Sequence, residues 1–156
     1  MSPADSAPPA GEKRGGTTAG RVMAVDLGDR RVGLALTDPT RTISSPLKTI
    51  PMTSESGLAV ALLALCVEKD VGLVVVGLPV SADGTEGPGC ARARRIRQRL
   101  VDAGMDTVVH DESWTSRDAE AAVRETGGKR RGSRDRIDAV AASLILRDYL
   151  SEASRP

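Results

Sequence analysis

The sequence predicts an α/β fold in which a mixed five-stranded sheet carries helices on both faces. The apolar runs 22–27 and 32–37 are separated only by a short turn after Gly28, which is typical of an antiparallel hairpin. The unbroken apolar run 73–76 is typical of a parallel strand that helices cover on both sides. Three strands precede the first helix and strands and helices alternate afterwards, which predicts three antiparallel strands followed by two parallel ones.

The remaining segments complete this order. Residues 42–50 contain Pro46 and form an edge strand, because proline cannot donate a hydrogen bond to a neighbouring strand. A helix begins at Ser54 and continues through Val67, and residues 107–111 form the last strand. Helical spacing of apolar residues predicts three further helices, at 89–103, 116–126 and 137–150.

Length and composition predict one globular domain. The chain has 156 residues, of which 40% are hydrophobic, enough for one core and too few for two full domains. Residues 1–20 are rich in Pro, Ala, Gly, Ser and Thr, so we expect a disordered tail followed by a single domain at 21–152. No stretch is long and apolar enough to span a bilayer, and Cys66 and Cys90 lack metal-binding spacing. We expect a cytoplasmic protein with no membrane partner.

Basic residues are concentrated in two clusters. The net charge is only +1, so binding to nucleic acid would depend on local Arg and Lys residues. The segments ARARRIRQR, from Ala91, and KRRGSRDR, from Lys129, carry five basic residues each. The alternative is a solvated helix face and a flexible loop, which charge runs usually are. One Trp, one Tyr and no Phe argue against stacking of bases on aromatic side chains.

Two acidic residues stand at the carboxyl ends of predicted strands, where α/β sheets tend to place their sites. Asp26 alternates with Val22 and Ala24, so it lies on the same side of its strand as they do. The alternative is an Asp that caps the turn after it. Glu112 directly follows the last strand, which would lie parallel to the first. Its alternative role is to stabilise the N-terminus of the helix at 116–126.

Asp138 belongs to an apolar helical stripe. It shares one helix face with Ala141, Ala142, Ile145 and Tyr149, so its carboxylate is expected to face the sheet. A buried carboxylate must be hydrogen-bonded, neutralised or bound to a cation. The alternative is an N-cap at the start of the helix.

Three carboxylates without a cluster of cysteines or histidines favour Mg²⁺ or Mn²⁺ over zinc. The single His110 does not make a zinc site, and we expect at most a supporting or substrate-contacting role for it. Such a site suits hydrolysis of phosphodiesters, in which paired cations activate water and support the leaving oxygen.

Four motifs in order carry a resemblance to a known family. AVDLGDRRVGLALTD, VVVGLPVSADGTEGPGCARAR, HDESWTS and RIDAVAASLILRDYL span nearly everything after the tail. They resemble the YqgF/RuvX family of Holliday junction resolvases and pre-16S rRNA nucleases, in the RNase H-like superfamily. The chain departs from the family pattern at Ser113, where the family usually has an arginine, so Arg117 or the loop at Lys129 would have to supply that phosphate contact.

The resemblance implies an RNase H-like fold and a catalytic, metal-binding triad of Asp26, Glu112 and Asp138 that holds two Mg²⁺ or Mn²⁺ ions. It also places a basic pair, Arg30 and Arg31, after the first turn. Together with the two basic clusters, the expected contacts to nucleic acid are Arg30, Arg31, Arg92, Arg95, Arg99, Lys129, Arg130 and Arg131.

The resulting hypothesis is a metal-dependent, endonucleolytic nuclease that acts on structured RNA, processing the 5′ end of pre-16S rRNA. The first alternative is a resolvase of four-way DNA junctions, which would need two active sites and therefore a homodimer. The second is a non-catalytic module that binds nucleic acid. An actin-like kinase or ATPase also has a hairpin like DLGDRRVG, but it needs two such domains and this chain has one.

Overall fold

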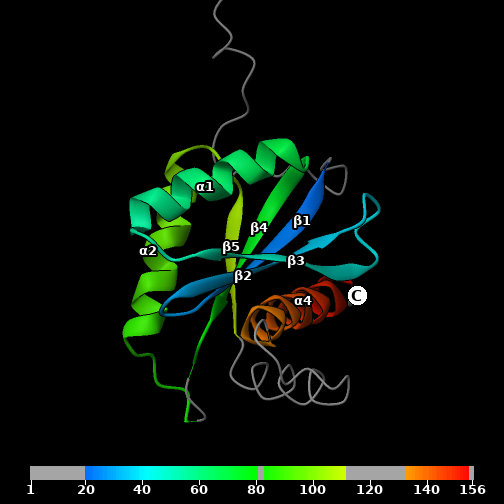
Figure 1. Cartoon of the computed structure of the whole chain (residues 1–156). Helices are drawn as coiled ribbons and strands as arrows, with labels where there is room; N and C mark the ends of the chain where they lie inside the picture. Colours follow the sequence, from blue (N-terminus) through cyan, green and yellow to red (C-terminus); the bar gives the residue numbers. More distant parts are fainter. Residues whose placement is uncertain (1–19, 81–82, 112–132, 155–156) are drawn as a thin grey trace, which may run out of the picture.

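A computed structural model of the chain describes residues 20–80, 83–111 and 133–154, and it contains the predicted mixed sheet (Figure 1). The strands lie in the order β3-β2-β1-β4-β5. The first three pair in antiparallel fashion, and β4 and β5 continue the sheet in parallel to β1. The bounds are β1 (Arg21–Leu27), β2 (Arg31–Thr37), β3 (Ser44–Pro51), β4 (Val71–Leu78) and β5 (Thr107–Asp111).

Pro46 lies in the edge strand β3, as predicted. It is opposite Ala35 of β2, next to a shift in register between Leu34 and Ala35. A proline in an edge strand removes a donor where the neighbouring pairing is already irregular. The irregularity is confined to the pairing of β2 with β3, because the pairing of β2 with β1 keeps a regular register.

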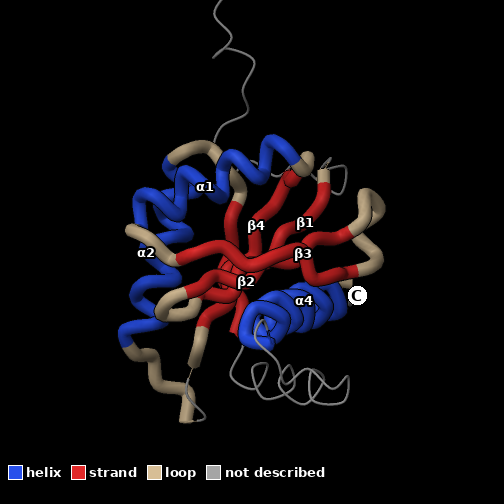
Figure 2. The backbone as a smooth tube through the Cα atoms, viewed as in Figure 1, coloured by secondary structure: helices blue, strands red, loops and turns tan. Residues whose placement is uncertain are grey.

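Two layers of helices cover the sheet, so the predicted helices on both faces are confirmed (Figure 2). Helix α1 (Glu55–Glu68) begins after Ser54, whose hydroxyl accepts the Gly57 backbone N–H at 2.9 Å. Helix α2 (Pro88–Asp102) lies beside α1 on the same face. Helix α4 (Ser133–Ala153) covers the opposite face and begins four residues before its predicted start. The helix predicted at 116–126 lies outside the described residues.

The two faces have different cores. Large aliphatic residues of α1 and α2, such as Leu62, Ile96 and Leu100, pack on one face of the strands. The α4 face combines small residues, Ala24 and Ala35 in the strands and Ala142 in the helix, with larger ones such as Ile145 and Leu146. None of the helices in the described ranges is long and apolar enough to cross a membrane.

Candidate active site

Asp26 lies near the carboxyl end of β1 on the face that α4 covers. Val22 and Ala24, two and four residues before it, belong to the core between the sheet and α4. Because side chains alternate along a strand, the Asp26 side chain follows them onto that face. It is partly exposed and stands directly opposite Gly33 in the β1–β2 pairing.

Gly33 is the point at which α4 approaches the sheet most tightly among the described glycines. A Cβ atom at this position would lie 2.0 Å from the carbonyl oxygen of Asp138 and 2.3 Å from its carbonyl carbon. Only glycine fits under such a contact, because the obstructing atoms belong to the helix backbone. Residues that are paired across antiparallel strands have Cα atoms about 4.5–5.5 Å apart. Gly33 therefore brings the backbone of Asp138 next to the strand position of Asp26.

Asp138 lies in the second turn of α4 and not at its N-cap. The helix begins at Ser133, so the alternative role of Asp138 as an N-cap is wrong. Ala142 and Ile145, on the same helical stripe, are fully buried against the sheet. The Asp138 side chain keeps 24% of its surface exposed. This combination of a buried stripe and an accessible carboxylate is suited to binding an ion at the rim of the sheet.

Arg31 is the counter-ion of Asp138. Its Nε atom donates to the Oδ2 atom of Asp138 at 3.0 Å, and the Arg31 side chain is 32% exposed. The two residues are 107 positions apart in the sequence, so periodicity alone does not reveal the pair. The arginine that we predicted to contact nucleic acid is thus in contact with a predicted metal ligand.

The third predicted carboxylate, Glu112, lies outside the described residues, as do the predicted contacts at Lys129, Arg130 and Arg131. The described part of β5 ends at Asp111. It runs parallel to β4, which separates it from β1. The parallel direction predicted for the strand before Glu112 is therefore confirmed.

Helix α2 lies on the other face of the sheet, and three of its arginines, Arg92, Arg94 and Arg95, contact carboxylates. Arg95 donates from Nη2 to Glu55 at 2.7 Å, and this hydrogen bond is the main reason that the pKa of the Glu55 carboxyl is lowered. Arg92, in the first turns of α2, contacts Asp29 in the β1–β2 turn at 3.3 Å. Arg99 lies about 10 Å further along the helix axis than Arg92. Of Arg92, Arg95 and Arg99, Arg92 lies closest to the turn that holds Arg30 and Arg31.

His110 belongs to a side-chain group that the sequence analysis missed. Its Nε2 atom lies 2.7 Å from Oδ2 of Asp148 in α4, and Tyr149 packs edge-on against its ring. Ligand atoms of His110, Asp148 and Glu152 all lie within 4.8 Å of one another. The i, i+4 spacing of the two helical acids was the available signal, but nothing in the sequence indicates which strand they face.

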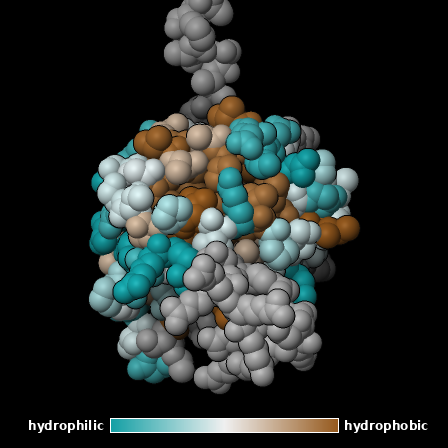
Figure 3. Space-filling view, in the orientation of Figure 1, coloured by the Kyte–Doolittle hydropathy of each residue, from teal (hydrophilic) through white to brown (hydrophobic). Residues whose placement is uncertain are grey.

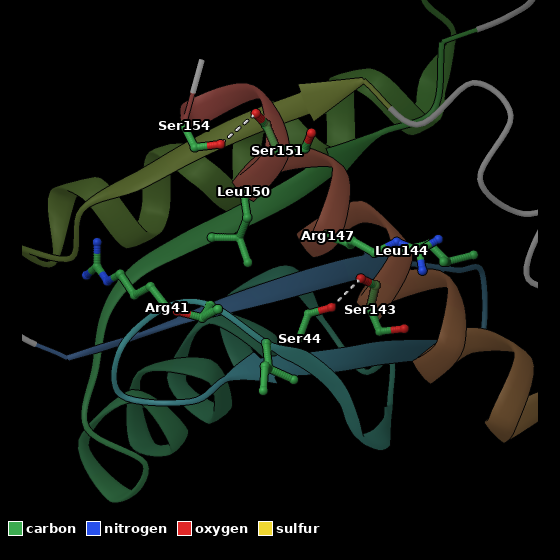
Figure 4. Close-up of a pocket in the computed structure, with 10 residues that line it drawn as sticks. Arg41, Ser44, Ser143, Leu144, Arg147, Leu150, Ser151 and Ser154 are labelled. Carbon is green, nitrogen blue, oxygen red and sulfur yellow. Dashed lines mark hydrogen bonds between the residues drawn. The ribbon is translucent and has the colours of Figure 1, made fainter. Parts of the chain in front are cut away.

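A cavity of about 640 Å³ lies at the other end of α4 from Asp138 (Figure 4). It is lined by the β2–β3 loop, including Arg41, and by the C-terminal half of the helix. The Ser44 hydroxyl points toward α4 there and donates to the Ser143 backbone carbonyl at 3.0 Å. The cavity is therefore separate from the pair of carboxylates.

The donors around Gly33 fit a hard cation better than zinc. Asp26 and Asp138 supply only carboxylate oxygens, the ligands that Mg²⁺ and Mn²⁺ prefer. Both side chains are partly buried on one face of the sheet, where charge needs compensation. Arg31 already provides part of that compensation for Asp138.

Close relatives of the chain share its full domain. The chain is 40% identical over 134 residues to a protein of Roseiflexus sp. (strain RS-1), and the alignment covers 84% of this chain and 94% of the relative. It is 42% identical over 136 residues to a protein of Rubrobacter xylanophilus, which covers 84% and 92%. Both relatives carry the provisional name pre-16S rRNA nuclease.

Solved structures confirm the predicted RNase H-like fold. RuvC of Thermus thermophilus superposes with a TM-score of 0.55 at 15% identity, covering 86% of this chain and 97% of RuvC. A Fowlpox virus resolvase, solved with Holliday junction DNA, superposes with a TM-score of 0.52 at 11% identity, covering 86% and 99%. Residues 20–152 match the RuvX family, which is described as Holliday junction resolvase. The chain therefore belongs to the RuvX family.

Proposed function

We propose that this protein is a metal-dependent nuclease that hydrolyses phosphodiester bonds in structured nucleic acid. The observation that carries the proposal is the tight contact between Gly33 of β2 and the Asp138 backbone of α4, which we call the seat. It holds Asp138 beside the strand position of Asp26. Glu112 is proposed as the third carboxylate, and together the three would hold two Mg²⁺ or Mn²⁺ ions. Bound divalent cations supply the charge that activates water and supports the leaving oxygen.

Basic residues near this seat are proposed to hold the substrate backbone. Arg30 is exposed in the β1–β2 turn, and Arg92 reaches the same turn through Asp29. Hydrophilic side chains gather over this turn and the neighbouring start of α2 (Figure 3). Arg95 and Arg99 are proposed to contact the substrate further from the carboxylates, with Arg95 having to release Glu55. Lys129, Arg130 and Arg131 complete the proposed set.

The proposed substrate is the 5′ end of pre-16S rRNA, processed in the cytoplasm. The names of the relatives support this choice, because these relatives match 84–86% of this chain at 37–42% identity. The alternative substrate is a four-way DNA junction, which the fold shared with the viral resolvase supports. Cutting a symmetric junction would require a homodimer, so sedimentation of the protein with and without a junction separates the alternatives further.

The proposal is tested by cleavage of an rRNA precursor and of a four-way junction, each with Mg²⁺ or Mn²⁺. We expect Asp26→Asn and Asp138→Asn to lower the cleavage rate by at least about 100-fold, since each removes a charged ligand. Glu152→Gln is the matched control, because it removes one carboxylate of the His110 group. It should leave the rate within about twofold of wild type.

Two outcomes would overturn the proposal. If both Asn variants cleave as fast as wild type, the carboxylates at Gly33 are not catalytic. If the wild type binds either substrate tightly but cleaves neither, the protein is a non-catalytic nucleic-acid module, the second alternative. A loss of cleavage with Glu152→Gln alone would move the site to the group around His110.

A further inference from the structure

We propose that Arg31 couples the binding of substrate phosphate to the binding of the cation, by exchanging its Asp138 contact for a phosphate contact. This inference rests on the proposed nuclease function and assigns to Arg31 a role beyond holding nucleic acid. In the protein alone, Arg31 neutralises Asp138 and weakens cation binding. When a phosphate binds, the Arg31 guanidinium contacts the phosphate in place of Asp138. The Asp138 carboxylate can then bind the cation.

The contact with Asp138 is the first basis of this inference. Arg31 Nε donates to Asp138 Oδ2 at 3.0 Å, so the guanidinium occupies one oxygen of a proposed cation ligand. Arg31 is two residues before Gly33, and alternation along β2 therefore places both on the α4 face. The side chains of both partners remain partly exposed, at 32% and 24%, so phosphate and cation can reach them.

The rigidity of the seat is the second basis. The carbonyl group of Asp138 already fills the space in which a Cβ of Gly33 would lie, so α4 cannot move closer to β2. Core residues of the same helix, Ala142 and Ile145, are fully buried against the strands. The backbone of Asp138 is thus held in place, and the long Arg31 side chain is the flexible partner.

Charge balance gives the direction of the coupling. Asp26 and Asp138 together carry two negative charges, and Arg31 carries one positive charge beside them. A divalent cation added there would meet a guanidinium of like charge, which opposes binding. A phosphate adds a negative charge and matches the planar donors of arginine. Cation and phosphate should therefore strengthen one another's binding by the same factor, since coupling between two ligands is reciprocal.

The test measures Mn²⁺ affinity by calorimetry and by electron paramagnetic resonance, with and without a nucleoside 5′-monophosphate. This probe carries a phosphate but has no diester bond to cleave. For wild type we expect the nucleotide to tighten Mn²⁺ binding by about fivefold or more. Arg31→Ala should bind Mn²⁺ about fivefold more tightly than wild type without nucleotide, and should gain little when it is added.

Three further variants make the result specific. Arg147→Ala removes an exposed arginine of α4 that lines the separate cavity, and it should keep the wild-type Mn²⁺ affinity and coupling. Arg31→Lys retains the charge and should stay near wild type without nucleotide. Arg31→Gln keeps a donor for Asp138 without the charge, so it should also bind Mn²⁺ more tightly than wild type. It replaces Arg31→Ala in the test if that variant fails to fold. Thermal unfolding of each variant reports whether the fold is retained.

The inference is overturned if both uncharged Arg31 variants fold and bind Mn²⁺ no more tightly than wild type, or if nucleotide tightens Mn²⁺ binding equally with and without Arg31. Failure of the proposed function has a different signature. In that case Asp26→Asn and Asp138→Asn would leave Mn²⁺ affinity unchanged, so no cation would bind at the seat for Arg31 to influence.

Discussion

The two faces of the sheet differ in what their packing achieves. On one face, large side chains of α1 and α2 such as Leu62 and Ile96 form a core whose buried residues include no acidic or basic side chain. On the other, α4 lies over Gly33 and several alanines, and the short side chains let its backbone approach the strands. The first face therefore mainly provides stability. The second uses close approach to bring together carboxylates that are distant in the sequence.

The surface reflects the same division. Hydrophobic side chains gather over α1 and the strands beside it, whereas hydrophilic ones gather over the β1–β2 turn (Figure 3). Val60 and Val67 of α1 are exposed by 68% and 85%. The arginines of α2 that flank this face contact acids such as Glu55 and Asp29. The basic flank predicted from the sequence is therefore already partly neutralised within the protein.

The largest effect on the comparison is expected from Gly33→Ala. The added methyl would meet the backbone of Asp138, so α4 must shift away from β2. We expect a loss of unfolding free energy of at least about 3 kcal/mol, the upper range for overpacking, and loss of cleavage in the fraction that folds. Urea unfolding and cleavage assays measure the two effects.

Gly87→Ala is the control for this prediction. A Cβ at Gly87 meets no atom within 4 Å, and its φ of −109° is open to all residues. Because Gly87 is the N-cap of α2, where alanine is less favourable than glycine, the unfolding free energy should fall by no more than about 1 kcal/mol. An equally stable Gly33→Ala protein would show that the contact with α4 is not restrictive.

Ile96→Ala should affect the other face in a different way. Ile96 is fully buried among the residues of α1, α2 and the strands, so its truncation leaves a cavity. We expect a loss of about 2–5 kcal/mol in unfolding free energy. At a temperature where the variant is folded, its cleavage rate should remain within about twofold of wild type. A selective loss of cleavage in folded protein would contradict the division between the two faces.

Acid should weaken the β2–β3 loop through Asp38. Backbone N–H groups of Ile43 and Thr42 donate to its carboxylate at 2.7 and 2.9 Å, and with the Thr40 hydroxyl they hold the pKa of Asp38 well below its usual value. A carboxyl with a lowered pKa in the folded state stabilises the fold above its ordinary pKa. This contribution is lost as the pH falls toward the folded-state value. Asp38→Asn should therefore lower the melting temperature at pH 7 and flatten its decline in acid.

The smallest effect is expected from Glu55→Gln. The pKa of the Glu55 carboxyl is lowered by Arg95, so their contact adds stability at neutral pH and loses it as the pH falls. Exposed ion pairs contribute little, and the melting temperature should change only slightly. By freeing Arg95, however, the variant should bind nucleic acid more tightly at low salt, which fluorescence anisotropy measures. Unchanged affinity would remove Arg95 from the proposed contacts.

Much of the fold could be predicted because its signals are local. The turn after Gly28 and the proline in 42–50 indicated a hairpin and an edge strand, and both are confirmed. The helical stripe that contains Asp138 was sufficient to predict that it faces the sheet. The start of α4 was predicted too late, because its first residues, SRDR, are polar and add nothing to the apolar period.

The sequence by itself determined the order of the described strands and helices and the face on which Asp26 and Asp138 lie, because alternation and helical period are local properties of the chain. Only the tertiary structure decided which residues meet. Arg31 pairs with Asp138 and His110 with Asp148 because α4 crosses the sheet at one angle and height, which no sequence period encodes. Gly33 shows most clearly the difference between what the sequence and the tertiary structure determine. Only the structure shows that the Asp138 backbone packs directly on Gly33, which leaves no space for a Cβ atom.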